Sequence, residues 1–531
     1  MITDVRNLSE GTVIDSDICI VGAGAAGITL AMELIGHDFS VNLLESGGLD
    51  FEDDVQALND GDCVSQHKVD LMWTRLRYFG GTTGHWGGNC APLDERDFET
   101  RSWVPDSGWP ISRKDLERFY PRAYRYCELP SDDYSVDHWA EISEKFRRSR
   151  IPVTGEEIGE KLFLKSPPTR FGDAYRADLA KPGSQCTVYL HANVVEIETG
   201  EDASEVVGLR TRDVSGRGCR FTARIFILAS GIENARLLLL SNKVRPNGLG
   251  NDHDVVGRYF MAHTTIRTGR AMLEVPKETV RFYGLDTWAT RFESGGAPFM
   301  NALQPTYPVQ EREGMLNSVV FLDESYEGEH APGFVALRKI VKQIIQGRVP
   351  DRLGENLGKV IGDLDSVAKA LYARASGNSD YRAVEMRYFA EQAPNRDSRV
   401  MLGPERDSLG QNRLVLDWRL QQIDKHTILR TQDLVAREFG KLGVGRLRVQ
   451  FENEEDPWPA SIDSSAHFMG TTRMHKDPRH GVVDENCRVH GIRNLYVAGG
   501  SVFPTSGATM LTMNIVTLAV RLADHLIGKL A

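Results

Sequence analysis

The stretch "DICIVGAGAAGITLAMELIG", from Asp17 to Gly36, decides the fold. It opens with a short β-branched, apolar run that is typical of a buried strand, and it ends with a run of helical periodicity. Between them, Gly22, Gly24 and Gly27 form the pattern G-x-G-x-x-G. In that pattern the first glycine makes a tight turn, the second lets a pyrophosphate approach the backbone, and the third lets the helix pack on the strand. The stretch therefore predicts a Rossmann-like nucleotide-binding unit.

A second strand follows in SVNLLES, from Ser40 to Ser46, which completes a βαβ unit. Glu45 ends this strand, where an acid accepts hydrogen bonds from ribose hydroxyls. The helix N-terminus offers free N–H groups and a positive dipole end to phosphates. The residues that we expect to bind the nucleotide here are Gly22, Gly24, Ala25, Ala26, Gly27, Glu45 and Ser46.

Two further glycine-rich turns distinguish FAD from NAD as the cofactor. They are GGTTGHWGG, from Gly80 to Gly88, and AGGSVFPTSG, from Ala498 to Gly507. A glycine cluster usually means that backbone approaches a partner closely. Three such turns suit one long cofactor that is contacted along its length, and no second G-x-G-x-x-G follows a strand. The pattern favours FAD.

The bulk composition excludes several classes of protein. The formal net charge of −11 argues against nucleic acid or an anionic membrane surface as a partner. Seven scattered cysteines without a C-x-x-C pair predict neither a disulfide framework nor a metal site. The N-terminus lacks the basic and apolar regions of a signal peptide, and we find no apolar window long enough to be a transmembrane segment. We therefore expect a cytoplasmic protein.

The chain divides into three parts by pattern. We expect residues 1–264 to form the first part of an FAD-binding domain with a flavin loop at 78–92, residues 265–455 to be mainly a substrate-binding domain, and residues 456–531 to return to the FAD domain. The middle block holds two helical stretches, at 334–347 and 354–375. The first is basic and apolar-striped near Lys339–Lys342. We interpret it as a solvated helix, with a partner or membrane face as the alternative.

These motifs together resemble those of the glucose-methanol-choline (GMC) oxidoreductases, flavoenzymes that oxidise alcohols. The matching pieces are DICIVGAGAAG with LLES, then GGTTGHWGG, ASGIENARLLL, GRYFMAH, and finally SAHFMGTTRM through LAVRLADHL. They occur in the family's order and are most similar to its sugar-oxidising branch of pyranose oxidases and fructose or sorbitol dehydrogenases. The resemblance implies an α/β fold, α+β overall, in which a Rossmann-like FAD-binding domain is interleaved with an antiparallel-sheet substrate domain.

The resemblance also implies which further residues contact the flavin. They are Gly81, Thr82, Gly84, His85, Trp86, Gly88, Asn89, Val194, Ala229, Ser230, Gly231, Gly500, Ser501, Met510 and Leu511. In some pyranose oxidases the histidine that matches His85 is covalently bonded to the flavin. The alternative is that His85 only packs beside Trp86 or hydrogen-bonds within the loop.

Alcohol oxidation by a flavin needs a base that is neutral at working pH and within reach of the hydroxyl, and histidine meets both demands. The family position of this base falls on His467 in HFMGTT. The family's second polar residue, a histidine or asparagine, falls here on Met510, which cannot donate a normal hydrogen bond. Asn514, one helical turn further on, is our candidate to replace it. The other reading is that the second polar group is absent.

The function that we predict is FAD-dependent oxidation of an alcohol on a sugar, glycoside or hydroxylated natural product to a carbonyl. The hydride goes to flavin N5, His467 is the base, and oxygen, a quinone or a protein takes the electrons. Two alternatives stay open. One is a redox-neutral flavoprotein, a lyase or isomerase on the same fold, which the methionine at 510 motivates. The other is the catalytic subunit of a larger dehydrogenase that docks an electron carrier on helices within 334–375.

Overall fold

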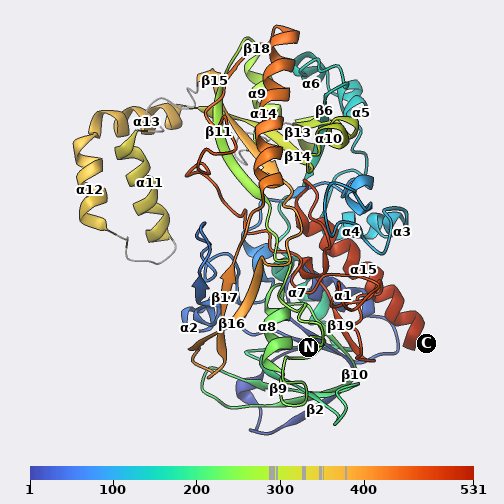
Figure 1. Cartoon of the computed structure of the whole chain (residues 1–531). Helices are drawn as coiled ribbons and strands as arrows, with labels where there is room; N and C mark the ends of the chain where they lie inside the picture. The colour runs from blue at the N-terminus through green and yellow to red at the C-terminus, as the bar shows by residue number, and fades with distance from the viewer. Residues whose placement is uncertain are drawn as a thin grey trace.

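The computed structural model describes residues 1–285, 293–294, 297–325, 331–345, 350, 352–376 and 380–530. Two large sheets dominate it, one in the lower and one in the upper half of Figure 1. The N- and C-termini both lie in the lower half. Helices and strands mix in both halves, so the α/β prediction is confirmed.

The lower sheet is mainly parallel and has the strand order β1-β7-β3-β2-β10-β9-β8, with β19 also paired to β10. β2, β3, β7 and β10 pair in parallel, as a Rossmann-like sheet requires, whereas β8 and β9 add an antiparallel hairpin. The strands are β1 (Ile2–Asp4), β2 (Val13–Val21), β3 (Val41–Leu44), β7 (Cys186–Leu190), β8 (Asn193–Thr199), β9 (Val206–Arg212), β10 (Arg220–Leu228) and β19 (Leu495–Val497). The first and last parts of the chain thus share one sheet.

The upper sheet is antiparallel and has the order β18-β11-β15-β14-β13-β6-β5, with β12 paired to β13. Its strands are β5 (Asn89–Cys90), β6 (Ile158–Lys165), β11 (Thr264–Leu273), β12 (Glu293–Ser294), β13 (Ala297–Pro305), β14 (Ser318–Ser325), β15 (Asp380–Ala390) and β18 (Gly445–Arg448). Helix α14 (Gln422–Leu442) crosses this sheet and buries Ile428, Leu434, Val435 and Phe439 in the same core as the strands.

The chain crosses between the two halves more often than the boundaries at 264 and 455 indicate. β5 and β6 come from the first 264 residues but pair within the upper sheet. Conversely, β16 (Arg399–Arg406) and β17 (Asn412–Asp417) join β4 (Gly61–Cys63) in a small third sheet that lies beside the lower half. The interleaving places loops from both halves around the space between them.

The helices cover the lower sheet, flank the upper one, and form one projection. The remaining helices are α1 (Ala25–Leu34), α2 (Asp53–Gln56), α3 (Lys114–Glu117), α4 (Tyr120–Tyr126), α5 (Val136–Ile142), α6 (Glu144–Ser149), α7 (Phe171–Leu179), α8 (Glu233–Leu240), α9 (Lys277–Phe282), α10 (Tyr307–Glu313), α11 (Pro332–Ile345), α12 (Leu353–Gly362), α13 (Leu364–Ser376) and α15 (Leu511–Leu530). The predicted helix at 334–347 is α11 as far as Ile345, and its last two positions lie outside the described residues. The predicted helix at 354–375 is two helices, α12 and α13, divided at Asp363.

Helix α15 is long and apolar. Of the helices in the described ranges, α15 alone has the length and hydropathy to cross a membrane. Most of it is buried, and it packs on α1 and α4 in the lower half. These properties are those of a core helix, and no membrane span is indicated.

Candidate functional site

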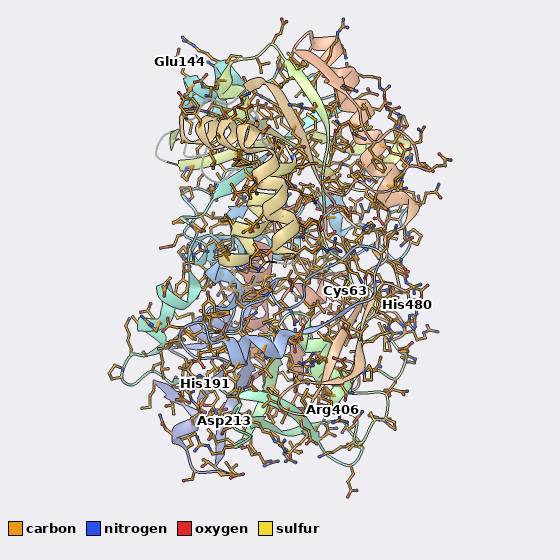
Figure 2. The ribbon with its side chains drawn as sticks, turned by 90° about the vertical axis from the view of Figure 1, so that its left-hand side faces the viewer. Cys63, Glu144, His191, Asp213, Arg406 and His480 are labelled. Carbon is orange, nitrogen blue, oxygen red and sulfur yellow. The ribbon has the colours of Figure 1, made fainter. Side chains whose placement is uncertain are left out.

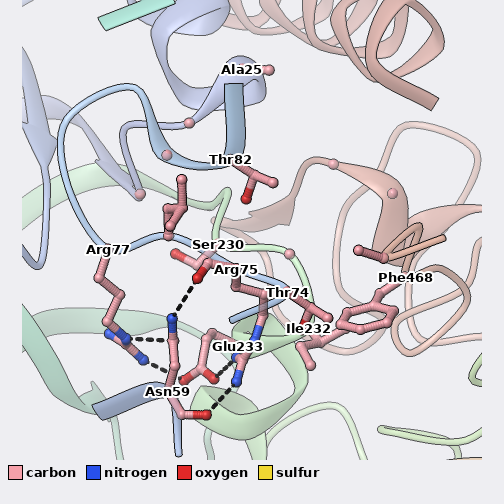
Figure 3. Close-up of a pocket in the computed structure, with 18 of the residues that line it drawn as sticks. Ala25, Asn59, Thr74, Arg75, Arg77, Thr82, Ser230, Ile232, Glu233 and Phe468 are labelled. Carbon is pink, nitrogen blue, oxygen red and sulfur yellow. Dashed lines mark hydrogen bonds and ion pairs between the residues drawn. The ribbon is translucent and has the colours of Figure 1, made fainter. Parts of the chain in front are cut away.

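A cavity of about 940 Å³ lies between the two halves of the molecule. Its walls come from the G-x-G-x-x-G loop, the end of β3, the Gly80–Gly88 loop, the start of α8, β11, β15 and the segment 461–468. Ligand sites usually occupy about 300–1,000 Å³. The cavity therefore has room for a large, elongated ligand, and Figure 3 shows one part of it.

The first glycine loop is shaped for the tight turn and close packing that the sequence predicts. Gly22 has φ +102°, and a Cβ there would lie 2.6 Å from Ser230 Oγ. A Cβ on Gly27 would lie 1.9 Å from the carbonyl oxygen of Gly22, so helix α1 packs directly on the turn. At Gly24, by contrast, no atom of the described residues other than its two chain neighbours lies within 4 Å of a Cβ position, and the residue lines the cavity. The backbone at Gly24 thus borders open space.

The N-terminus of α1 faces the same space with uncapped donors. Gly24 is its N-cap residue and supplies no side-chain hydrogen bond to the first turn. The first N–H groups of a helix have no partner within the helix, and they bind phosphate oxygens readily. Glu45, at the end of β3, is buried and accepts from the backbone N–H of Ala23 at 3.0 Å and of Gly47 at 3.0 Å. Glu45 thus fixes the backbone at Ala23 and Gly47, and it lines the cavity.

The second glycine loop lies against the first. A Cβ on Gly81 would lie 3.2 Å from Gly24 Cα, so the two turns meet at backbone distance. The absence of a side chain at Gly81 thus permits the close approach of the two backbones. His85 follows the short helix Gly81–Gly84 and lines the cavity. Burial lowers its pKa, and nearby Arg170 lowers it further, so the imidazole is neutral at physiological pH.

Most of the predicted cofactor residues meet at this cavity. Those that line it are Gly22, Gly24, Ala25, Ala26, Glu45, Ser46, Gly81, Thr82, His85, Trp86, Gly88, Asn89, Val194, Ala229, Ser230, Gly231, Gly500, Met510 and Leu511. Gly27, Gly84 and Ser501 lie behind the wall instead. A Cβ on Gly84 would overlap the hydroxyl of Tyr78, and Ser501 Oγ accepts from Asn234 Nδ2 at 3.0 Å. Gly27 and Gly84 are thus closely packed, and Ser501 is hydrogen-bonded within the protein.

Asn514 is a correction to the predicted site. The structure does not bring its side chain to the cavity wall. Its Oδ1 accepts from Leu93 N–H at 3.1 Å, and its Nδ2 donates to the carbonyl oxygens of Ala91 and Met510 at 3.0 and 3.3 Å. The amide is thus fully used in holding the backbone after the flavin loop, so it cannot replace the polar group that is missing at position 510.

One end of the cavity carries a half-buried ion cluster that the sequence did not reveal (Figure 3). Arg77 contacts Glu233 at 2.9 Å, Arg75 also pairs with Glu233, and Arg77 Nε donates to Asn59 Oδ1 at 2.7 Å. Burial alone would raise the pKa of Glu233, but Arg236, Arg77 and Arg75 outweigh it and hold that pKa below its usual range. The cluster ties the segment before the flavin loop to the start of α8.

The predicted base, His467, lines the cavity and has a partner that the sequence analysis did not identify. Its Nδ1 lies 3.0 Å from Nδ1 of His263, which is fully buried. His263 Nε2 lies 3.0 Å from the carbonyl oxygen of Gly507 and 3.2 Å from that of Ser506. Because carbonyl oxygens only accept, Nε2 of His263 carries a proton. The signal available in the sequence was the GRYFMAH motif, which ends at His263.

These contacts fix the protonation of both rings. Burial lowers the pKa of His263 to about 4, so the ring is neutral and its Nδ1 is an acceptor. His467 must then donate from Nδ1, which leaves Nε2 as its basic nitrogen. Burial, helped by His263, lowers the pKa of His467 to about 3 despite the opposing effect of Asp463. His467 is therefore held neutral, in the tautomer with a basic Nε2.

Around His467 the cavity wall is polar. Thr265 and Ser465 share a hydrogen bond, and Asp463 accepts from the backbone N–H of Ser465 at 3.0 Å. Arg267 and Arg387 lie opposite one another on β11 and β15, and both pair with Asp323. The apolar part of this wall is formed by Leu285, Phe389 and Met510. Hydroxyls and charges of both signs thus surround the predicted base.

Comparison with known proteins shows which family and which enzymes the chain resembles. Residues 394–519 match the family described as GMC oxidoreductase. The chain is 24% identical to 6'''-hydroxyparomomycin C oxidase of Streptomyces lividus, over 97% of this chain and 92% of that protein. It is 23% identical to the fructose dehydrogenase large subunit of Gluconobacter japonicus, over 97% and 98%. The C-terminal part of the chain thus matches the GMC oxidoreductase family, and the whole chain resembles named oxidases and dehydrogenases. The chain also shares its fold with formate oxidase of Aspergillus oryzae RIB40, a structure that concerns FAD modification, at a TM-score of 0.57 and 15% identity, covering 98% of this chain and 99% of that one.

The cofactor of this protein is FAD, and the cavity fits it. The open space at Gly24 and the uncapped start of α1 suit the pyrophosphate, Glu45 suits a ribose, and the Gly80–Gly88 loop reaches toward the same cavity as His467. Among the described residues, no three His, Cys, Asp or Glu side chains are gathered as metal ligands. The chain is an oxidoreductase enzyme.

Proposed function

We propose that this protein acts as a GMC-type oxidoreductase, which oxidises an alcohol group of a sugar or glycoside to a carbonyl, with His467 as the base that takes the hydroxyl proton. The observation that carries the proposal is the hydrogen bond between the Nδ1 atoms of His467 and His263 at 3.0 Å. It leaves a neutral imidazole with a basic Nε2 on the wall of the cofactor cavity. A base in this state is ready to accept a proton without first losing one.

The proton and the electrons of the alcohol go to different places. Bound FAD supplies the two-electron acceptor, which takes the hydride from the carbon. The hydroxyl proton goes to Nε2 of His467, and the ring becomes an imidazolium that still donates from Nδ1 to His263. The carboxylate of Asp463 favours this cation electrostatically. His263, whose pKa is about 4, stays neutral throughout and keeps the ring of His467 oriented.

The polar wall supports a polyhydroxylated substrate. Thr265, Ser465, Asp463 and the Arg267–Arg387 pair offer donors and acceptors on the His467 side of the cavity. The names of the two relatives point to a hydroxylated aminoglycoside and to fructose as substrates of those proteins. We therefore place the substrate of this protein among sugars and their glycosides, and the electrons pass on to oxygen, a quinone or a protein.

Anaerobic mixing tests the proposal. The holoprotein is mixed without oxygen with fructose, glucose, an aryl glucoside and an aminoglycoside, and the flavin absorbance is followed. The expected result is bleaching of the flavin by at least one of these, with one equivalent of carbonyl product per flavin. If a panel member is converted to an isomer or cleaved while the flavin stays oxidised, the redox-neutral alternative holds and the proposal is wrong.

A second measurement separates the two roles of His85. The neutral imidazole on the cavity wall is chemically able to bond to the flavin. Acid precipitation of the holoprotein distinguishes the cases, because a flavin bonded to His85 stays in the pellet and a flavin held by contacts alone passes into the supernatant. The His85→Ala variant is the control for assignment of the bond.

A further inference from the structure

Helices α11, α12 and α13 form a projection that stands out from the upper half of the molecule (Figure 1). Figure 2, which faces that side, shows the projection in front of the rest of the chain. The three helices pack against one another around a small core of Phe334, Val367 and Ala370. We refer to residues 332–376 as the helical projection.

The helical projection carries an exceptional share of exposed apolar surface. Half of the large hydrophobic side chains that are exposed in the described structure belong to it, although it is less than a tenth of the chain. They are Val335, Val341, Ile344, Leu353, Leu357, Ile361, Leu364, Leu371 and Tyr372. Apolar residues scattered singly on a surface need no explanation, but a concentration of this kind marks an interaction site.

The exposed residues follow helical stripes that point away from the core of the projection. On α12, Leu353, Leu357 and Ile361 recur at intervals of four and are exposed, while Asn356 and Val360, on the neighbouring face, are buried or half-buried. On α13, Leu364, Leu371 and Tyr372 share one face, at the i, i+7 and i+8 positions. The inner face of such a helix is covered by the rest of the projection. Its exposed apolar face indicates that another apolar surface covers it.

The charge of the helical projection indicates what kind of surface contacts these exposed apolar side chains. It contains eight Lys or Arg and four Asp or Glu, a formal net charge of +4, in a chain whose net charge is −11. Glu355 pairs with Lys359 at 2.8 Å, Asp365 pairs with Lys369 at 2.8 Å, and Asp363 accepts from the backbone N–H of Gly333. The acidic side chains described here are thus used internally, and the excess charge is positive.

We propose that the helical projection binds the surface of a lipid bilayer that contains anionic lipids. Apolar stripes accompanied by Lys and Arg are the combination that seats helices at the boundary between headgroups and acyl chains. Long basic side chains bury their stems there and keep the charge among the headgroups. The net negative charge of the whole chain argued against an anionic membrane surface as a partner. The helical projection, which makes the proposed contact, has a net positive charge instead. The proposal is independent of the substrate of the enzyme.

Vesicle co-sedimentation tests it with the holoprotein. The vesicles are phosphatidylcholine with about one quarter phosphatidylglycerol, and pure phosphatidylcholine for comparison. The variant is Leu357→Asp with Ile361→Asp, which replaces two outward side chains of α12. The matched control is Val64→Asp with Val244→Asp, two exposed valines elsewhere that receive the same charges.

The wild type and the control are expected to sediment with the anionic vesicles, more weakly with pure phosphatidylcholine, and less at high salt. The α12 variant should lose at least about tenfold in binding while it keeps its flavin content. Absence of wild-type binding to anionic vesicles, or equal binding by the α12 variant, overturns the proposal. So does a wild-type dimer in solution that the α12 variant converts to monomers, because the apolar stripes are then an interface between copies.

Discussion

Nδ1 of His467 and Nδ1 of His263 lie 3.0 Å apart, although the residues are separated by more than two hundred positions in the chain. A loop in the C-terminal part supplies one ring, and the residue just before β11 supplies the other. Because His263 also donates to two carbonyl oxygens, the pair has one hydrogen-bond pattern in its neutral form. That pattern presents Nε2 of His467 as a base.

Replacing His263 should lower turnover without removing the base itself. In His263→Phe, His467 loses its acceptor and its tautomer is no longer fixed, so we expect kcat to fall about 10- to 100-fold. His263→Gln retains an amide oxygen to accept and an N–H to donate, and should recover part of the loss. The measurement is the rate of anaerobic flavin reduction by substrate across a pH series. Equal rates for the Phe variant and the wild type would show that the pair has no role in orienting the base.

Met510 offers a gain-of-function prediction. It lines the cavity at the position where the family has a polar residue, and Asn514 does not replace it. Met510→Asn adds a donor for the oxygen that loses its proton, and the rate of flavin reduction should rise by about tenfold or more if the pocket accepts the amide. Met510→Leu has similar volume and no donor, and should stay near the wild-type rate. A fall of the same size in both variants contradicts a hydrogen-bonding role at this position.

A substitution at Gly24 should affect cofactor binding without affecting folding. Apart from its two chain neighbours, no residue in the part of the chain that the structure describes lies within 4 Å of a Cβ at Gly24, so Gly24→Leu should fold and fill space that the pyrophosphate needs. We expect a colourless protein whose apo form melts at the wild-type apo temperature. Gly440→Leu on α14 meets equally open space outside the cavity and serves as the control. A yellow Gly24→Leu protein with full flavin content would contradict the phosphate cradle.

Asp97 predicts a pH dependence of stability. It is buried, and burial, followed by the charges of Asp94 and Glu391, raises its pKa to about 7. The folded state therefore holds a proton that the unfolded chain releases above its ordinary value of 3.8, and the stabilisation is lost as the pH rises toward 7. In Asp97→Asn that loss is absent. The free energy of unfolding of the variant should therefore increase relative to that of the wild type as the pH rises between these values.

The expected gain for Asp97→Asn is at most about 1.4 kcal/mol per pH unit. Chemical denaturation at several pH values measures it. A flat difference between Asp97→Asn and the wild type would mean that Asp97 is ionised in the folded protein.

The sequence was sufficient where a local pattern carries the geometry. The G-x-G-x-x-G loop, the strand that ends at Glu45 and the Gly80–Gly88 loop each follow from spacing over a few residues, and all of them reach the cavity. Asn514 fails for a local reason as well. The prediction needed Met510 and Asn514 on one helix face, but α15 begins at Leu511, and the backbone oxygen of Ala91 takes up the amide.

The remaining features depend on contacts between distant segments. His263 meets His467, and Glu233 meets Arg75 and Arg77, only because the chain crosses repeatedly between the two sheets. No periodicity or spacing predicts such meetings. The helical projection is similar. The helices at 334–347 and 354–375, and an apolar stripe on the first, were visible in the sequence, but which apolar side chains stay exposed was not. Which face of a helix is covered depends on what packs there.

The central claim is that His467 removes the proton of the substrate alcohol in a cavity that holds FAD. The most direct test is the rate of anaerobic flavin reduction in His467→Ala, measured beside its flavin content. The account predicts wild-type flavin content with a rate that is lower by about 100- to 10,000-fold. A variant that binds flavin normally and is reduced by the substrate at the wild-type rate would contradict it.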